Sequence, residues 1–300
     1  MTGVAGAVAR WWLRPAPLAR LAVLRVVVYL FVPIDLFART SQVVPHAYGS
    51  NELYDPVELL AAIGQPAPQP WLVQTLRIVI IVTSLVAATG RLPRVAGWVV
   101  ALAFLDWCCL AMSYGKVDHD HLAILVAVFV LPTVPRASLR SAGESEAAGW
   151  ALRCVEVAVI ATYFLSAYAK VVRFGHPHWL VGATFAWAVI RRGTFLAQPL
   201  LHHPLVLLLS QWALFGLECL TPIVLFLGRR GRIVAVVALE TFHVVTQAMI
   251  RINFVPLMVC LVVFLPLEDI APRLAGAGDT LARRLRLPRL GGWGRALSDG

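Results

Sequence analysis

One apolar stretch carries three residues that could act together chemically. Glu156, Tyr163 and Lys170 are spaced seven residues apart, so in a helix they would lie on one face. Lys170 stands at the end of this stretch. Its amine could snorkel, with the stem in lipid and the charge among the headgroups. It could instead be a desolvated amine with a lowered pKa that acts as a base.

The scarcity of lysine bears on this choice. The chain has 26 basic residues, and only Lys116 and Lys170 are lysines. Arginine keeps its proton in a protein, so it serves where only positive charge is needed. A lysine retained among so many arginines therefore hints at amine chemistry. Both interpretations of Lys170 stay open at this point.

Histidines in two loop segments raise the question of a metal site. One segment is D-H-D-H, residues 118–121, and the other is H-P-H, residues 176–178. Imidazole and carboxylate groups are suitable metal ligands. Neither segment has the helical i, i+4 spacing, and no glutamate-bearing H-E-x-x-H occurs. We expect no bound metal, and surface histidines are the simpler interpretation for most of them.

Ionisable residues also stand inside the apolar stretches. Such groups are costly in a membrane and usually face a bundle interior or a cavity. One interpretation is a set of buried ion pairs that hold helices together. Glu240 and His243 are i, i+3 on one face, and a titratable imidazole in a span favours function. The full set is Arg25, Asp35, Arg77, Asp106, Glu156, Glu218, Glu240 and His243.

The composition predicts an all-α, polytopic integral membrane helical bundle. Hydrophobic residues make up 59% and charged residues 14% of the 300 residues, and the mean hydropathy is +0.77. The chain has room for about eight spans of about 20 residues each. The arginines stand at span ends and not in one patch, so we expect no nucleic acid partner. The five cysteines lie in apolar spans, and we interpret them as reduced residues that pack in the core.

We expect a basic head at residues 1–16, a transmembrane domain at 17–267 and a basic, mobile tail at 268–300. A re-entrant or interfacial helix is expected at 181–190, between spans five and six. A second short interfacial helix is expected at 55–63. The expected spans are 18–38, 70–89, 95–114, 122–134, 150–172, 204–227, 233–250 and 252–267.

The arginines also predict an orientation. With eight spans, the head, the turns at 91–94, 136–140 and 229–232, and the tail share one side. That side holds most of the arginine, so both termini should be cytoplasmic. The loops that carry His119 and Trp179 then face the other side of the membrane.

Five segments, in order, carry a resemblance to a known family. L-A-R-L-A-V-L-R-V-V-V-Y-L-F-V-P-I-D (18–35) resembles the first span of the HTTM family, a membrane domain shared with vitamin K-dependent gamma-carboxylase. D-H-D-H-L (118–122) is similar to its Asn-His-x-x-Leu loop. Y-F-L-S-A-Y-A-K (163–170) and W-L-V-G (179–182) resemble its Tyr-Phe-x-x-x-x-x-Lys and Trp-x-x-Gly motifs. E-T-F-H-V-V-T-Q (240–247) is similar to its Phe-His span.

The resemblance implies a chemistry. In the carboxylase a lysine deprotonates vitamin K hydroquinone, O2 adds to give a strong base, and CO2 adds to the carbanion of a peptide glutamate. Lys170 matches the base, and His119 matches the supporting histidine. Further candidates for a quinone pocket are His121, Glu156, Tyr163, Trp179, Glu240 and His243.

The resemblance is to a short bacterial form, without the carboxylase's large C-terminal luminal domain. Asp118 stands where the family has Asn, and Ala169 where the carboxylase has a second lysine. We expect a bacterial inner-membrane protein that uses reduced menaquinone or a vitamin K-type hydroquinone, with O2 and CO2 as co-substrates. A peptide or protein substrate on the extracytoplasmic side is left open. The alternatives are a non-catalytic scaffold or peptide-maturation partner, and a proton-coupled transporter.

Overall fold

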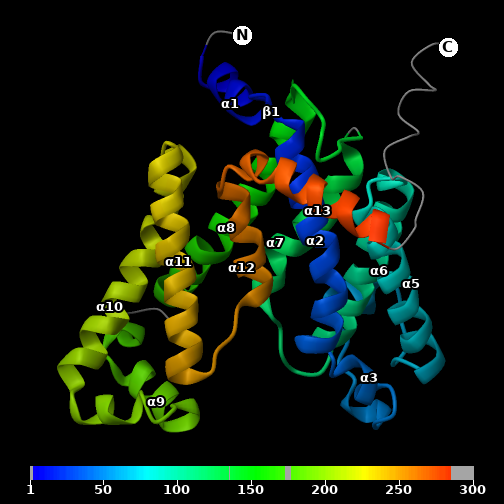
Figure 1. Ribbon diagram of the computed structural model, residues 1–300. Helices are drawn as coiled ribbons and strands as arrows, with labels where there is room; N and C mark the ends of the chain where they lie inside the picture. Colours follow the sequence, from blue (N-terminus) through cyan, green and yellow to red (C-terminus); the bar gives the residue numbers. More distant parts are fainter. Residues whose placement is uncertain (1–2, 135, 173–176, 285–300) are drawn as a thin grey trace, which may run out of the picture.

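The computed structural model describes residues 3–134, 136–172 and 177–284, and helices dominate them. Six helices are long and apolar enough to cross a membrane, so the chain is a multi-pass membrane protein (Figure 1). The last part of one span is the 3₁₀ helix η6 (Thr221–Phe226), which continues α10. The six are α2 (Leu18–Ala38), α5 (Pro70–Ala88), α6 (Pro93–Met112), α8 (Glu146–Val172), α10 (Pro204–Leu220) and α11 (Arg229–Ile250).

Among the described residues fewer helices than the expected eight are long enough to span, because predicted spans four and eight form shorter helices. Around span four, α7 (Leu122–Val130) continues η2 (His119–His121) and runs into η3 (Leu131–Thr133), which contains a proline. In place of span eight, α12 (Val255–Leu261) continues as η7 (Val262–Phe264). The chain then turns by 83° at Pro266, which lacks the N–H that would continue the helix.

The chain beyond this bend is helical. After η8 (Leu267–Asp269) comes α13 (Ala271–Arg284), which lies across the end of the bundle (Figure 1). If the bent pair is counted as one span, the part of the chain that the structure describes has seven. The expected mobile tail therefore begins as an ordered helix up to residue 284, and residues 285–300 lie outside the described part.

The core is formed by residues of α2, α5, α6, α7, α8 and α12, together with η3. Trp107, Tyr29 and Phe104 are among its largest fully buried side chains. Gly97 lies where α6 meets its neighbours, and a Cβ there would come within 2.7 Å of the Tyr29 hydroxyl and 2.8 Å of Pro132. A side chain at position 97 would therefore separate helices that touch.

A two-stranded ribbon ties the start of α2 to the start of α8. β1 (Ala16–Pro17) pairs antiparallel with β2 (Glu144–Ser145), and the Leu18 N–H donates to the Gly143 carbonyl at 3.1 Å. The ribbon follows α1 (Val4–Trp12), a short helix at this end of the molecule (Figure 1).

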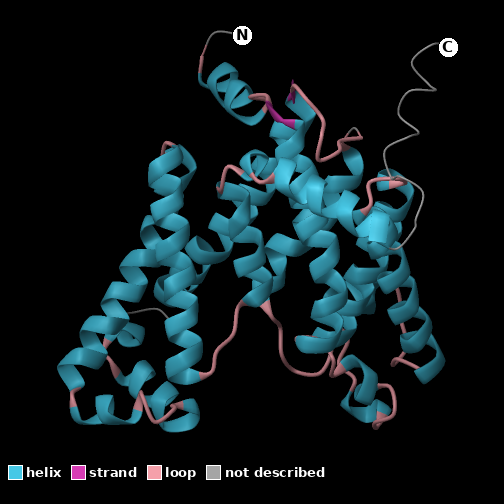
Figure 2. Cartoon of the chain, viewed as in Figure 1, coloured by secondary structure: helices cyan, strands magenta, loops and turns pink. Residues whose placement is uncertain are grey.

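The opposite end carries short helices and loops (Figures 1 and 2). α3 (Val43–His46), η1 (Asn51–Leu53) and α4 (Glu58–Ala62) lie between α2 and α5, and α4 confirms the short helix expected at 55–63. The helix expected at 181–190 is α9 (Ala183–Arg192), which is flanked by η4 (Pro177–Leu180) and η5 (Gln198–His202).

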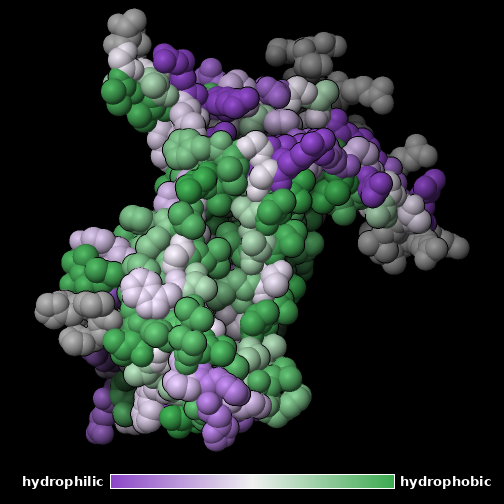
Figure 3. Space-filling view, turned by 90° about the vertical axis from the view of Figure 1, so that its left-hand side faces the viewer, coloured by the Kyte–Doolittle hydropathy of each residue, from purple (hydrophilic) through white to green (hydrophobic). Residues whose placement is uncertain are grey.

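The surface separates by polarity. Figure 3 shows hydrophobic side chains over the middle of the molecule and hydrophilic side chains gathered toward both ends. Large apolar residues of the spanning helices are exposed, for example Ile78 of α5 at 59% and Leu209 of α10 at 59%. A hydrocarbon layer would cover such a surface.

Candidate functional site

A cavity of about 780 Å³ lies among α8, α9, α10, α11 and α12. Most of its lining residues are apolar, chiefly alanine, leucine, phenylalanine, valine and isoleucine. Ligand cavities typically have this size and apolar character, with a few polar groups that fix orientation. The polar and ionisable side chains that line it include His119, Thr162, Tyr163, Ser166, Lys170, Glu218 and His243.

Lys170 lines the cavity near the end of α8. Its Nζ lies 2.6 Å from Oε1 of Glu218 and 4.4 Å from the centre of the Trp179 ring. The lysine side chain is only 15% exposed. Its charge is therefore held by a carboxylate and an aromatic face, which is not the geometry of a snorkelling lysine.

Glu218 comes from α10, and its side chain is 9% exposed. The Ser166 hydroxyl donates to Oε1 at 3.4 Å. The interpretation of Glu218 as a member of a buried ion pair is confirmed. Its partner could not be found from the sequence, because α8 and α10 meet only in the folded chain.

His119 lines the same cavity from η2. Its ring packs edge-on against Phe254, with centroids 5.9 Å apart. It lies close enough to Glu218 for an electrostatic interaction. The lysine and histidine singled out as candidates for catalysis therefore share one cavity.

Tyr163 and His243 form a second polar pair in the cavity wall. The Tyr163 hydroxyl and Nε2 of His243 are 2.5 Å apart, and both residues are buried, at 4% and 2% exposed. Phe242 and Phe254 flank the imidazole, with ring centroids 4.8 and 5.0 Å away. Three of the six expected pocket residues, Tyr163, Trp179 and His243, thus line the cavity.

His121 does not line this cavity. It is buried behind the loop, with Nδ1 3.2 Å from Asp120 and Nε2 3.2 Å from Asp35. The network continues from Asp35 to Thr40, which accepts from Trp107 Nε1 at 2.8 Å. In a 3₁₀ helix with three residues per turn, side chains two apart point in different directions, so His119 and His121 have different surroundings.

Glu156 lies outside the cavity as well. It is paired with Arg153 and with Arg232, whose Nη1 donates to it at 2.9 Å. The seven-residue spacing places it on the helix face of Lys170, but fourteen residues separate them by about 21 Å along the axis. Glu240 is likewise absent from the lining, which takes His243 from the same helix.

Two observations bear on the question of a metal site. His176 lies outside the described residues, and so does the side chain of His178. Among the residues that the structure describes, no three His, Cys, Asp or Glu side chains form a group that could hold a metal ion.

Comparisons with known proteins gave one match. A family model described as the HTTM domain matches residues 13–268, close to the expected domain at 17–267. No curated protein and no solved structure matched the chain.

Proposed function

The chain belongs to the HTTM domain family, and on that premise we propose that it is a membrane enzyme with a carboxylase-like, proton-abstracting chemistry. Lys170 is the base and His119 assists it. The observation that carries this proposal is that both side chains line one largely apolar cavity of about 780 Å³.

The cavity fits a reduced naphthoquinone such as menaquinol in size and polarity. Apolar side chains, among them Phe254, Leu214 and Leu217, would hold its rings and tail, and Trp179 stands beside Lys170. When bound, the quinol supplies an acidic hydroxyl group, with O2 and CO2 as the co-substrates of the carboxylase-like reaction. The side chains of this protein would carry out the proton transfers.

Lys170 must give up its proton before it can act as a base. Glu218 Oε1, 2.6 Å from Nζ, is placed to receive that proton. In this proposal the ion pair of the resting protein becomes a neutral amine beside a neutral carboxylic acid once an apolar ligand displaces water from the cavity. Glu218 is therefore proposed as the proton acceptor that prepares Lys170.

The His119 imidazole then has a supporting role. It reaches the cavity from a different element and interacts with Glu218. Once Lys170 has taken a proton from the ligand, a hydrogen bond from the imidazole would stabilise the anion that remains. The Tyr163–His243 pair forms the adjoining wall.

The position of the cavity suggests how a substrate arrives. Trp179, Phe185 and Val189 line it from η4 and α9, at the end away from α1 and α13 (Figure 1). We place that end outside a bacterial cytoplasmic membrane, with both termini cytoplasmic, because the arginine-rich turns favour it. A peptide or protein substrate would then approach from the extracytoplasmic side.

The transporter alternative needs Glu240 and His243 in one proton path. Only His243 lines the cavity, so we do not favour it. The scaffold alternative predicts that the chemistry of Lys170 is dispensable, and a single substitution separates it from the enzyme proposal.

The test is quinone epoxide formation by the purified protein in lipid nanodiscs supplied with menaquinol, O2 and labelled bicarbonate. Lys170→Arg keeps the charge and the pairing with Glu218 but cannot release a proton. We expect it to lower turnover by about 10²–10⁴-fold. Lys116→Arg, at the other lysine, which is exposed and paired with Asp118, is the matched control.

Full activity of Lys170→Arg would contradict the role of the base. Wild-type protein that neither binds menaquinol nor forms an epoxide would contradict the enzyme proposal and leave the scaffold alternative.

A further inference from the structure

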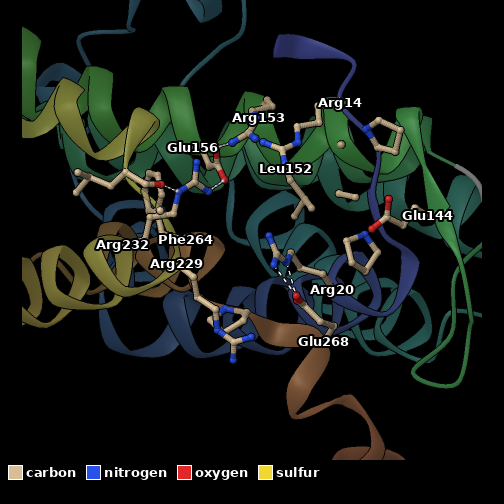
Figure 4. Close-up of a pocket in the computed structure, with 17 residues that line it drawn as sticks. Arg14, Arg20, Glu144, Leu152, Arg153, Glu156, Arg229, Arg232, Phe264 and Glu268 are labelled. Carbon is tan, nitrogen blue, oxygen red and sulfur yellow. Dashed lines mark hydrogen bonds and ion pairs between the residues drawn. The ribbon is translucent and has the colours of Figure 1, made fainter. Parts of the chain in front are cut away.

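A second cavity, of about 370 Å³, lies at the end of the bundle that carries α1 and α13. Figure 4 shows it between the start of α2, the first turns of α8 and the start of α11. Its charged lining residues are Arg14, Arg20, Arg153, Arg229, Arg232, Glu144, Glu156 and Glu268. Five arginines against three glutamates give this lining a net charge of +2.

Besides Arg153, three of these arginines are engaged by acidic residues of the protein, and one of them, Arg229, pairs with Asp269 outside the lining. Arg20 makes a two-pronged contact with Glu268, at 2.6 Å from Nε and 2.6 Å from Nη2. Arg232 donates to Glu156 at 2.9 Å and to the carbonyls of Leu225 and Leu227 at 2.9 and 3.0 Å. These contacts hold the walls together.

The other side of the cavity has excess positive charge. Glu156 accepts from both Arg153 and Arg232, so one negative charge serves two positive ones. Nε of Arg153 is buried and has no hydrogen-bond partner in the described part of the chain. No acceptor for the Arg14 side chain is found among the described residues either. A buried donor such as Nε of Arg153 is costly without an acceptor, and an anion would satisfy it and would also pair with the exposed Arg14 guanidinium.

The backbone of Arg14 packs against α8 one turn before Arg153. The Arg14 carbonyl lies against Gly149, where an added Cβ would be 1.9 Å from it. Arg153 follows Gly149 by one turn on α8, on the same face. Figure 4 shows the two guanidinium groups in the same part of the cavity. A phosphate group could accept from both, because the guanidinium fork matches its oxygens.

The surroundings indicate a lipid as the source of the phosphate. The Arg153 guanidinium lies 4.9 Å from the Trp11 ring, and Trp11 contacts Phe226, which is 76% exposed. Tryptophan and arginine next to exposed apolar surface are typical of the level of the lipid headgroups. Basic pockets between helices on the arginine-rich side suit anionic headgroups.

We propose that the Arg14–Arg153 cavity binds the phosphate group of an anionic phospholipid headgroup. The acyl chains of the lipid would extend past Phe226 and lie on the apolar surface of α10. This site is at the other end of α8 from Lys170, so its test does not depend on the proposed enzymatic function.

The test is the melting temperature of the delipidated, detergent-solubilised full chain after adding phosphatidylglycerol, phosphatidylcholine or inorganic phosphate, together with native mass spectrometry to count bound lipids. We expect phosphatidylglycerol to raise the melting temperature of the wild type more than phosphatidylcholine does. The variant Arg14→Gln/Arg153→Gln should bind phosphatidylglycerol about tenfold more weakly. Arg94→Gln, at an exposed arginine outside the cavity, should behave as wild type.

The Arg14 side chain is exposed and makes no hydrogen bond or ion pair with the described residues. Arg14→Gln alone should therefore fold even if the double variant does not, and it should lose part of the effect. Equal responses of wild type and Arg14→Gln to phosphatidylglycerol, or equal responses to the two lipids, would overturn the proposal. Millimolar phosphate that reproduces the whole effect would show a free-anion site and overturn the assignment to lipid.

Discussion

The amine of Lys170 on α8 and the carboxylate of Glu218 on α10 meet with Nζ 2.6 Å from Oε1. The two residues are 48 positions apart in the chain. Their pairing joins the helix that ends at the cavity to the helix that forms its far wall. The same pair therefore bears on the stability of the fold and on the proposed chemistry.

Glu218→Gln should destabilise the protein strongly. It leaves the Lys170 ammonium, 15% exposed, without its counter-charge, and breaking such a pair costs about 3–5 kcal/mol when it is buried. Adding Lys170→Met should restore part of the loss, because no uncompensated charge then remains. The measurement is unfolding of both single variants and the double variant in detergent, as a double-mutant cycle. Strictly additive losses would mean that the two side chains do not interact.

The sequence was enough to find much of the cavity. Tyr163 and Lys170 share a helix face by spacing, and the ordered family motifs added His119, Trp179 and His243. All five line the cavity. Spacing does not give the position along the helix axis. It therefore groups Glu156 with Lys170, although Glu156 lies at the other end of α8 in ion pairs.

Long-range pairing was also beyond the sequence. Asp35 and His121 are 86 positions apart and meet in the core, and no local pattern relates them. The number of spans was overestimated for a different reason. Hydropathy reports how apolar a segment is, but Pro132 and Pro266 help to decide where the shorter helices end.

Tyr163→Phe should cost about 1–3 kcal/mol of stability, because it removes the partner of a buried imidazole nitrogen. It should also weaken menaquinol binding if His243 is held in place for the ligand. Tyr168→Phe is the matched control, since Tyr168 is on the same helix but 55% exposed, and its effect should stay within about 0.5 kcal/mol. Chemical unfolding and quinol titration of both variants are the measurements. Equal behaviour of the two variants would mean that the Tyr163 hydrogen bond contributes nothing.

His121 should make stability depend on pH above neutrality. It stands in η2, outside the six spanning helices. Burial disfavours its charged form, but hydrogen bonds to Asp120 and Asp35 outweigh this and raise the pKa of His121 to about 9. The folded state thus holds a proton that the unfolded state releases near pH 6.5. The resulting stabilisation is complete below pH 6.5 and is lost as pH rises toward 9, at no more than about 1.4 kcal/mol per pH unit.

The measurement is the free energy of unfolding between pH 6 and 9.5 for wild type and His121→Gln. Wild type should lose stability over this range, while the variant should be less stable at pH 6 and should lack this part of the slope. The difference between the two curves removes the contribution of the other histidines and the cysteines. Parallel curves would contradict the assignment of a proton to His121.

Gly149→Ala should disturb the N-terminal ribbon and, with it, the position of Arg14. The new Cβ would be 1.9 Å from the Arg14 carbonyl oxygen, and a backbone atom cannot move aside as a flexible side chain can. We expect a loss of about 1–3 kcal/mol from overpacking and faster amide exchange at Leu18, whose N–H donates to Gly143 in the ribbon. Gly216→Ala in α10 is the matched control, because nothing lies within 4 Å of its Cβ and alanine favours a helix by about 0.5–1 kcal/mol. If both variants gain stability, the contact between residue 14 and α8 cannot be as close as the structure has it, and the pairing of Arg14 with Arg153 in one anion site would fail with it.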